Sequence, residues 1–138
     1  GEMRYLLTAS PAFVARHFPQ GLTPAALAKA PAVAFDQRDD MHVSFMARHF
    51  ALAPGGYPCH TVRSSEAFVA MAEQGLACCL IPELQIRQQL AQGLLLDLSP
   101  DNHLIERLYW HRWVLERGLH KQISQRLIEQ GRRALQPR

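Results

Sequence analysis

The chain has 138 residues, of which 48% are hydrophobic and 20% charged, so it is long enough for one domain with a real core and is neither disordered nor fibrous. Its net charge of +3 is unevenly placed: residues 1–102 hold 7 Lys/Arg against 9 Asp/Glu, and residues 103–138 hold 8 against 3. No apolar run approaches the roughly 20 residues that cross a bilayer, and no signal-peptide pattern opens the chain. We expect a cytoplasmic chain without a membrane partner.

The predicted elements alternate between strands and helices along the chain. Ser10 before Pro11 and Thr23 before Pro24 are typical helix starts, and Gly75 is a typical helix stop. In chain order, the sequence predicts a strand at 3–9, helices at 12–18 and 22–30, a strand at 32–35, a helix at 41–50, a strand at 57–63, a helix at 66–76, a strand at 77–82, a helix at 83–93, strands at 94–98 and 104–114, and a helix at 120–135.

This alternation with short loops predicts an α/β fold: parallel βαβ units in a Rossmann-like open sheet covered by helices on both faces. Ligands of such sheets lie beyond the carboxyl ends of the strands. One candidate boundary lies near residues 99–102, where turn residues cluster and the sign of the charge changes. The aromatic residues of 109–113 are explained by alternation on a core strand, although they also resemble a base-stacking surface.

A carboxylate cluster follows the apolar segment that ends at Phe35. Asp36, Asp39 and Asp40 lie just before the predicted helix at 41–50. One interpretation is structural: Asp39 caps the helix, Asp40 favours its positive end, and Asp36 is a solvated loop residue. The other is that carboxylates at a strand end bind a cation. Because no matching set of oxygen ligands at metal spacing is present, an organic ammonium or guanidinium group is the better candidate.

A second loop offers groups that bind an anion, whereas the carboxylates of the first loop bind a cation. Ser64, Ser65 and Glu66 place hydroxyls and backbone N–H groups at a predicted helix start, which suits a small carboxylate, although plain helix capping is the alternative. An amino acid carries one carboxylate and one or two cations. The two loops together therefore suit the two ends of an amino acid.

The remaining reactive residues do not indicate catalysis or a metal. Cys78 and Cys79 lie in an apolar strand, where a thiol is expected to be structural, and an odd count of three cysteines with Cys59 favours a reducing compartment. The seven histidines show no metal-ligand spacing, and no nucleophile motif or phosphate-binding loop is present. We expect no metal, no cofactor and no enzymatic activity.

Three segments carry a family resemblance: "LAKAPAVAFDQRDDMH" at 27–42, "PCHTVRSSEAFVAMAEQGLACCLIPELQI" at 58–86 and "LYWHR" at 108–112. They resemble the C-terminal part of the arginine- and lysine-responsive LysR-type transcriptional regulators, the ArgP or inhibitor of chromosome initiation group. Alanine at 28 replaces a lysine of the group's first motif. The likeness runs over nearly the whole chain in order. A tail with Arg126, Arg132 and Arg133 is a departure from the group.

The resemblance implies an effector-binding domain made of two subdomains similar to periplasmic binding proteins, with the effector in the cleft between them. Residues 1–99 resemble the second subdomain, and residues 100–138 resemble the strand and helix that return to the first. The winged helix-turn-helix and most of the first subdomain are not in the chain, so DNA would be bound by the missing part. We also expect a homodimer or an oligomer that exchanges the C-terminal segment.

By position, the resemblance assigns the effector site to Phe35, Asp36, Asp39, Asp40, Ser64, Ser65 and Glu66. Asp36 or Asp39 is expected to pair with the side-chain cation of lysine or arginine, and Ser64 or Ser65 with a backbone group of the amino acid. The sequence does not separate lysine from arginine. Two other functions stay open at this point: a nucleic-acid-binding surface on residues 103–138, and an amino-acid-metabolising enzyme with an aspartate base.

Overall fold

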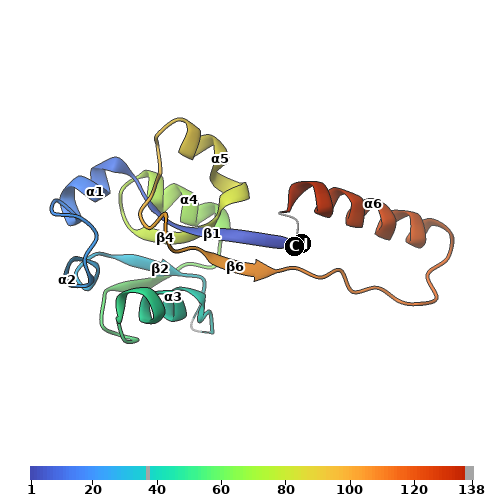
Figure 1. Cartoon of the computed structure of the whole chain (residues 1–138), viewed down its shortest axis with the longest axis horizontal. Coiled ribbons are helices and arrows are strands. Elements are labelled where there is room, and N and C mark those ends of the chain that lie inside the picture. The colour runs from blue at the N-terminus through green and yellow to red at the C-terminus, as the bar shows by residue number, and fades with distance from the viewer. Residues whose placement is uncertain (37, 136–138) are drawn as a thin grey trace.

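A mixed six-stranded sheet organises the computed structural model, which describes residues 1–36 and 38–135 (Figure 1). The strands are β1 (Glu2–Ala9), β2 (Ala32–Ala34), β3 (Cys59–Thr61), β4 (Cys78–Pro82), β5 (Leu96–Asp97) and β6 (Leu104–Arg107). The helices are α1 (Pro11–His17), α2 (Pro24–Leu27), α3 (Met41–Phe50), α4 (Ser65–Glu73), α5 (Glu83–Ala91) and α6 (Gly118–Ala134). The open α/β sheet predicted from the sequence is confirmed. None of the described helices is long and apolar enough to cross a membrane.

The strand order is β3-β2-β4-β1-β5, with β6 also paired to β1. β2 runs parallel to β3 and to β4, as βαβ units require. β1 runs antiparallel to β4, β5 and β6, so the predicted parallel βαβ pairing does not extend to this strand. The 8-residue β1 is long enough to pair with β5 through its last residues and with β6 through its first ones.

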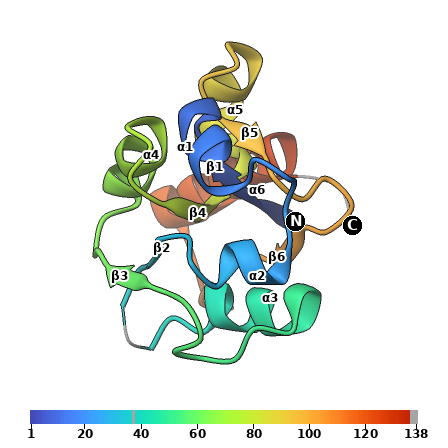
Figure 2. The ribbon, with the colours of Figure 1, turned by 90° about the vertical axis from the view of Figure 1, so that its left-hand side faces the viewer.

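Helices cover both faces of the sheet, and successive strand residues point to opposite faces (Figure 2). One core packs the sheet against α1, α2 and α3 and contains Leu7, Ala32, Cys78 and Leu80. The other packs it against α4 and α5 and contains the neighbouring residues Leu6, Val33, Cys79 and Ile81. Both strand cysteines are fully buried, and burial raises the pKa of the Cys78 thiol to about 12, which confirms their structural role.

Local capping explains the starts of α1 and α2 and the end of α4. The hydroxyls of Ser10 and Thr23 accept the N–H groups of Phe13 and Ala26, as predicted. The helix predicted at 22–30 is shorter, because only Pro24–Leu27 is helical. After α4, Gly75 adopts a φ of +67°, a left-handed conformation that favours glycine.

The C-terminal segment leaves the sheet after β6, and α6 then folds back toward Gly1 (Figure 1). The strand predicted at 104–114 ends at Arg107, and the aromatic residues after it do not lie in a core. Trp113 is 86% exposed and Val114 is 98% exposed. Of the residues of α6, only Ser124 is buried. The interpretation of 109–113 as core-strand residues is therefore wrong for this chain by itself.

Candidate functional site

The candidate site lies at the carboxyl ends of β2 and β3. These two strands are parallel, with Ala34 opposite Thr61, so the loops that follow them leave from the same edge of the sheet. The first loop begins with Phe35 and Asp36, and the second contains Arg63 and Ser64. The Phe35 ring packs on Phe68 of α4, with ring centroids 6.4 Å apart. The fold thus brings together the two loops that the sequence indicated.

Asp36 is held by its own loop and faces the other one. Its Oδ1 accepts the backbone N–H of Arg38 at 2.7 Å. Its Oδ2 lies 3.8 Å from Nη2 of Arg63, which is close for an ion pair but beyond hydrogen-bond distance. These side chains and Phe35 line a pocket of about 560 Å³. Asp36 therefore lines the pocket, and its Oδ2 has no hydrogen bond from Arg63.

Asp39 has a different role. Its Oδ2 accepts the N–H of Phe35 at 3.0 Å, and its Oδ1 accepts the N–H of Met41 at 3.1 Å. Both oxygens therefore connect the end of β2 to the start of α3, which supports the capping interpretation of Asp39. Asp40 precedes the helix directly but makes no side-chain capping hydrogen bond. Asp36 is the aspartate of this cluster that lines the pocket.

We predict that Asp39→Ala lowers the free energy of unfolding by about 1–2 kcal/mol, because two backbone N–H groups lose their acceptor. The exposed Asp40 supplies the matched control, and Asp40→Ala is expected to change stability by less than about 0.5 kcal/mol. Urea denaturation of both variants measures the difference. Equal losses in the two variants would contradict the assignment of the cap to Asp39.

The second loop is hydrogen-bonded within itself. The Ser64 hydroxyl accepts the N–H of Ala67 as the N-cap of α4 and donates to Oε2 of Glu66 at 3.0 Å. Ser65 also donates to this oxygen, at 3.5 Å. The pKa of Glu66 is lowered by hydrogen bonds from its own backbone N–H and from Ser64. The carboxylate of Glu66 thus already lies at the helix start, and neither serine lines the pocket beside Asp36.

The sequence reasoning did not single out Arg38 and Arg63, which both line this pocket, and Arg63 is the one that faces Asp36. It immediately precedes Ser64 and is 75% exposed in its side chain. Arg63 could have been predicted from the sequence because its guanidinium lies in the same loop as the serines expected to bind an anion. Its proximity to Asp36 depends on the pairing of β2 with β3, which is not visible in local sequence.

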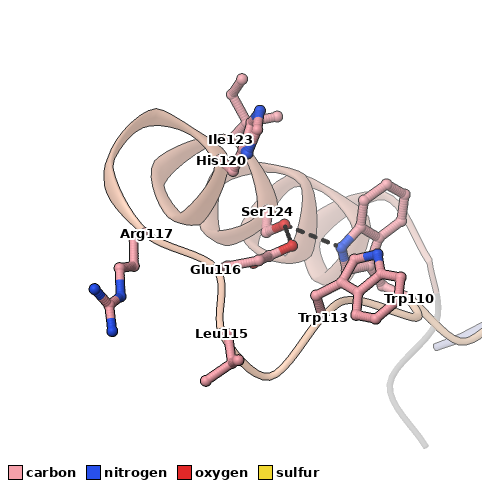
Figure 3. Close-up of a pocket in the computed structure, with 8 residues that line it drawn as sticks. All are labelled: Trp110, Trp113, Leu115, Glu116, Arg117, His120, Ile123 and Ser124. Atoms are coloured by element: carbon pink, nitrogen blue, oxygen red, sulfur yellow. Dashed lines mark hydrogen bonds between the residues drawn. The ribbon is translucent and has the colours of Figure 1, made fainter.

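A second hollow lies outside this site, between α6 and the segment before it (Figure 3). Trp110, Trp113 and Ile123 are among the residues that line it, and its volume is about 630 Å³. Trp110 Nε1 donates to Ser124 Oγ at 3.4 Å, and Ser124 donates to Glu116 at 2.8 Å. These two hydrogen bonds hold α6 to the preceding segment.

In the part of the chain that the structure describes, no group of three or more His, Cys, Asp or Glu side chains is arranged to hold a metal ion. The polar groups of the candidate site are the Asp36 carboxylate and the guanidinium groups of Arg38 and Arg63. Such groups recognise charged organic groups through charge-assisted hydrogen bonds.

Comparison with known proteins gives consistent matches. Residues 1–136 match the family model of the LysR substrate binding domain. The chain is 92% identical over 137 residues to the HTH-type transcriptional regulator ArgP of Aeromonas salmonicida, covering 99% of this chain and 46% of that protein. It is 50% identical over 135 residues to ArgP of Sodalis glossinidius, covering 98% and 46%. The chain thus spans about half the length of the curated relatives it matches.

Two solved structures agree with the fold. The crystal structure of ArgP from Mycobacterium tuberculosis matches with a TM-score of 0.81 and 37% identity, covering 97% of this chain and 44% of that one. Full-length LysG from Corynebacterium glutamicum with bound effector Arg matches with a TM-score of 0.86, covering 99% and 46%. At 24% identity, the LysG match shows the fold alone.

Proposed function

Because the chain belongs to the LysR substrate-binding domain family, we propose that it is the effector-sensing part of a transcriptional regulator and binds a basic amino acid, lysine or arginine. The observation that carries this proposal is Asp36, which lines the pocket at the end of β2 and whose Oδ2 lies 3.8 Å from Nη2 of Arg63. A carboxylate in this position suits an ammonium or guanidinium group. The resemblance of the sequence to the arginine- and lysine-responsive group supports the same class of effector, and LysG, which shares the fold, holds an arginine effector.

Within the site, we propose that Asp36 contacts a cationic group of the effector and that Phe35 forms an apolar wall beside it. Asp39 holds the loop in place through its hydrogen bonds to Phe35 and Met41, and Asp40 adds negative charge beside it. Ser64, Ser65 and Glu66 form the second loop at its edge. The curated relatives are transcriptional regulators, and the chemistry expected of this site is binding without catalysis.

We propose that residues 1–99 form the second subdomain of the effector-binding domain and that residues 100–138 belong with the first. The exposed apolar side chains of the C-terminal segment support this division, since an isolated domain rarely leaves so large an apolar surface uncovered. They are Leu108, Tyr109, Trp110, Trp113, Val114, Leu115, Leu119, Ile123 and Leu127. The chain by itself is expected to dimerise or to exchange this segment between copies.

Operator DNA would be bound by the part of the regulator outside this chain. An effector that binds the closed cleft better than the open one shifts the angle between the subdomains and, through the oligomer, the spacing of the DNA-binding heads. The rival proposal of direct nucleic-acid binding rests on the basic residues of 103–138, and it predicts binding that weakens steeply with salt.

The test is thermal melting of the full-length regulator with lysine, arginine and an uncharged amino acid. We expect the two basic amino acids to raise the melting temperature as their concentration increases. Asp36→Asn is expected to weaken their binding at least about tenfold, because the carboxylate that pairs with the ligand cation becomes a neutral amide, while Asp101→Asn, in an exposed turn outside the site, changes it little. An unchanged response in Asp36→Asn would remove Asp36 from the effector site.

A further inference from the structure

The charges that line the pocket beside Asp36 do not suit a lone cation. The pocket presents the two guanidinium groups of Arg38 and Arg63 and only the one carboxylate of Asp36. Asp39, the next acidic residue, uses both of its oxygens on backbone N–H groups. Among the side chains that line the pocket, a cationic side chain that entered alone would meet two guanidinium groups and one carboxylate. A ligand group that carries both charges would be favoured instead.

Asp36 and Arg63 are arranged as such a pair of opposite charges. Asp36 Oδ1 is occupied by the N–H of Arg38, which leaves Oδ2 as the oxygen that faces Arg63. The 3.8 Å between Oδ2 and Nη2 exceeds a hydrogen bond, so the guanidinium donors on that side are not committed to Asp36. A guanidinium with uncommitted donors can hold a carboxylate through two parallel hydrogen bonds.

The other candidate groups for a ligand carboxylate are already engaged. Ser64 and Ser65 both donate to the Glu66 carboxylate, which itself lies at the start of α4. A second carboxylate there would meet the negative charge of Glu66. Arg63, one residue earlier in the same loop, faces the pocket and carries the opposite charge.

We infer that Arg63 and Asp36 bind the α-carboxylate and the α-ammonium group of the amino-acid effector, so that its cationic side chain points away from this wall of the site. The inference rests on the proposed function and specifies the orientation of the effector. It differs from the sequence-based expectation, which paired an aspartate with the side-chain cation and a serine with the backbone group. Arg63 then selects amino acids over amines that carry the same side chain.

The test compares arginine with agmatine, which is arginine without its carboxylate, by calorimetric titration of the full-length regulator. Wild type is expected to bind arginine at least about tenfold more tightly than agmatine. Arg63→Gln is expected to remove most of this preference by weakening arginine without weakening agmatine. Arg63→Lys, which keeps the charge but loses the fork of donors, should retain part of the preference. Arg48→Gln, on the exposed last turn of α3, is the matched control and should leave the preference intact.

The possible outcomes distinguish a wrong orientation of the effector from a wrong proposed function. If Arg63→Gln binds both ligands more tightly and keeps the preference, Arg63 competes with the ligand cation for Asp36, and the inferred orientation is wrong. If wild type binds arginine and agmatine equally, no group of the site holds the carboxylate, and the inference is also wrong. If wild type binds neither arginine nor lysine, the proposed function itself fails.

Discussion

Replacing Phe45 with alanine is expected to lower the free energy of unfolding by about 3–5 kcal/mol. Phe45 lies on α3, is 1% exposed, and belongs to the core that packs α1, α2 and α3 against the sheet. Its ring lies 6.0 Å from that of Phe50. Truncation removes the buried ring and leaves a cavity that the surrounding side chains fill only in part.

Urea denaturation of Phe45→Ala measures this loss, and two further variants calibrate it. Phe45→Leu keeps most of the buried volume and is expected to cost less than Phe45→Ala. Phe35→Ala removes the same ring from a position that is 43% exposed, so its cost should be far smaller. If Phe35→Ala and Phe45→Ala cost the same, α3 does not pack on the sheet as described.

Acidification is expected to destabilise the protein through His42, a fully buried residue on the first turn of α3. Burial lowers the pKa of His42 to about 4, although the nearby Asp39 carboxylate acts in the opposite direction. Neither ring nitrogen has a hydrogen-bond partner among the described residues, and the hydroxyl of the neighbouring Tyr57 also lacks one. The imidazole is therefore neutral in the folded protein.

Because the pKa is lower in the folded than in the unfolded chain, the unfolded chain binds the proton more readily between about pH 6.5 and 4. Stability from the neutral imidazole is present above pH 6.5 and is lost as the pH falls toward 4. We expect His42 to account for about 3 kcal/mol of this loss by pH 4.

Denaturant unfolding at a series of pH values from 7 to 4 tests this linkage. His42→Leu cannot take up the proton and should lose less stability across the range than wild type. His111→Leu, at an exposed position, should follow the wild-type curve. Parallel pH curves for wild type and His42→Leu would show that His42 is not the group responsible.

Much of the fold can be predicted from local sequence because caps and periodicity act locally. The helix at 41–50 matches its prediction at both ends, and Ser10 caps the first helix as expected. The direction of β1 cannot be predicted in this way, since its antiparallel pairing with β4 involves residues more than 70 positions apart. The aromatic segment after β6 was predicted to lie in a core, but its side chains are exposed in this chain.

The sequence predicted which two loops form the candidate site, but not which side chains contact one another there. Both loops follow apolar strands, and the parallel pairing of β2 with β3 brings their ends together. Which aspartate faces the pocket depends on hydrogen bonds across the loop, where Asp39 is turned to Phe35 and Met41. Arg63 and Asp36 follow the neighbouring strands β3 and β2, and no spacing in the sequence indicates that they lie close together.

The central claim is that the chain senses a basic amino acid. Calorimetric titration of the full-length regulator with arginine and with citrulline tests it most directly, because citrulline replaces the guanidinium by an uncharged group of the same shape. We predict saturable binding of arginine and binding of citrulline at least about tenfold weaker. Equal affinities, or no binding of either arginine or lysine, would contradict the claim.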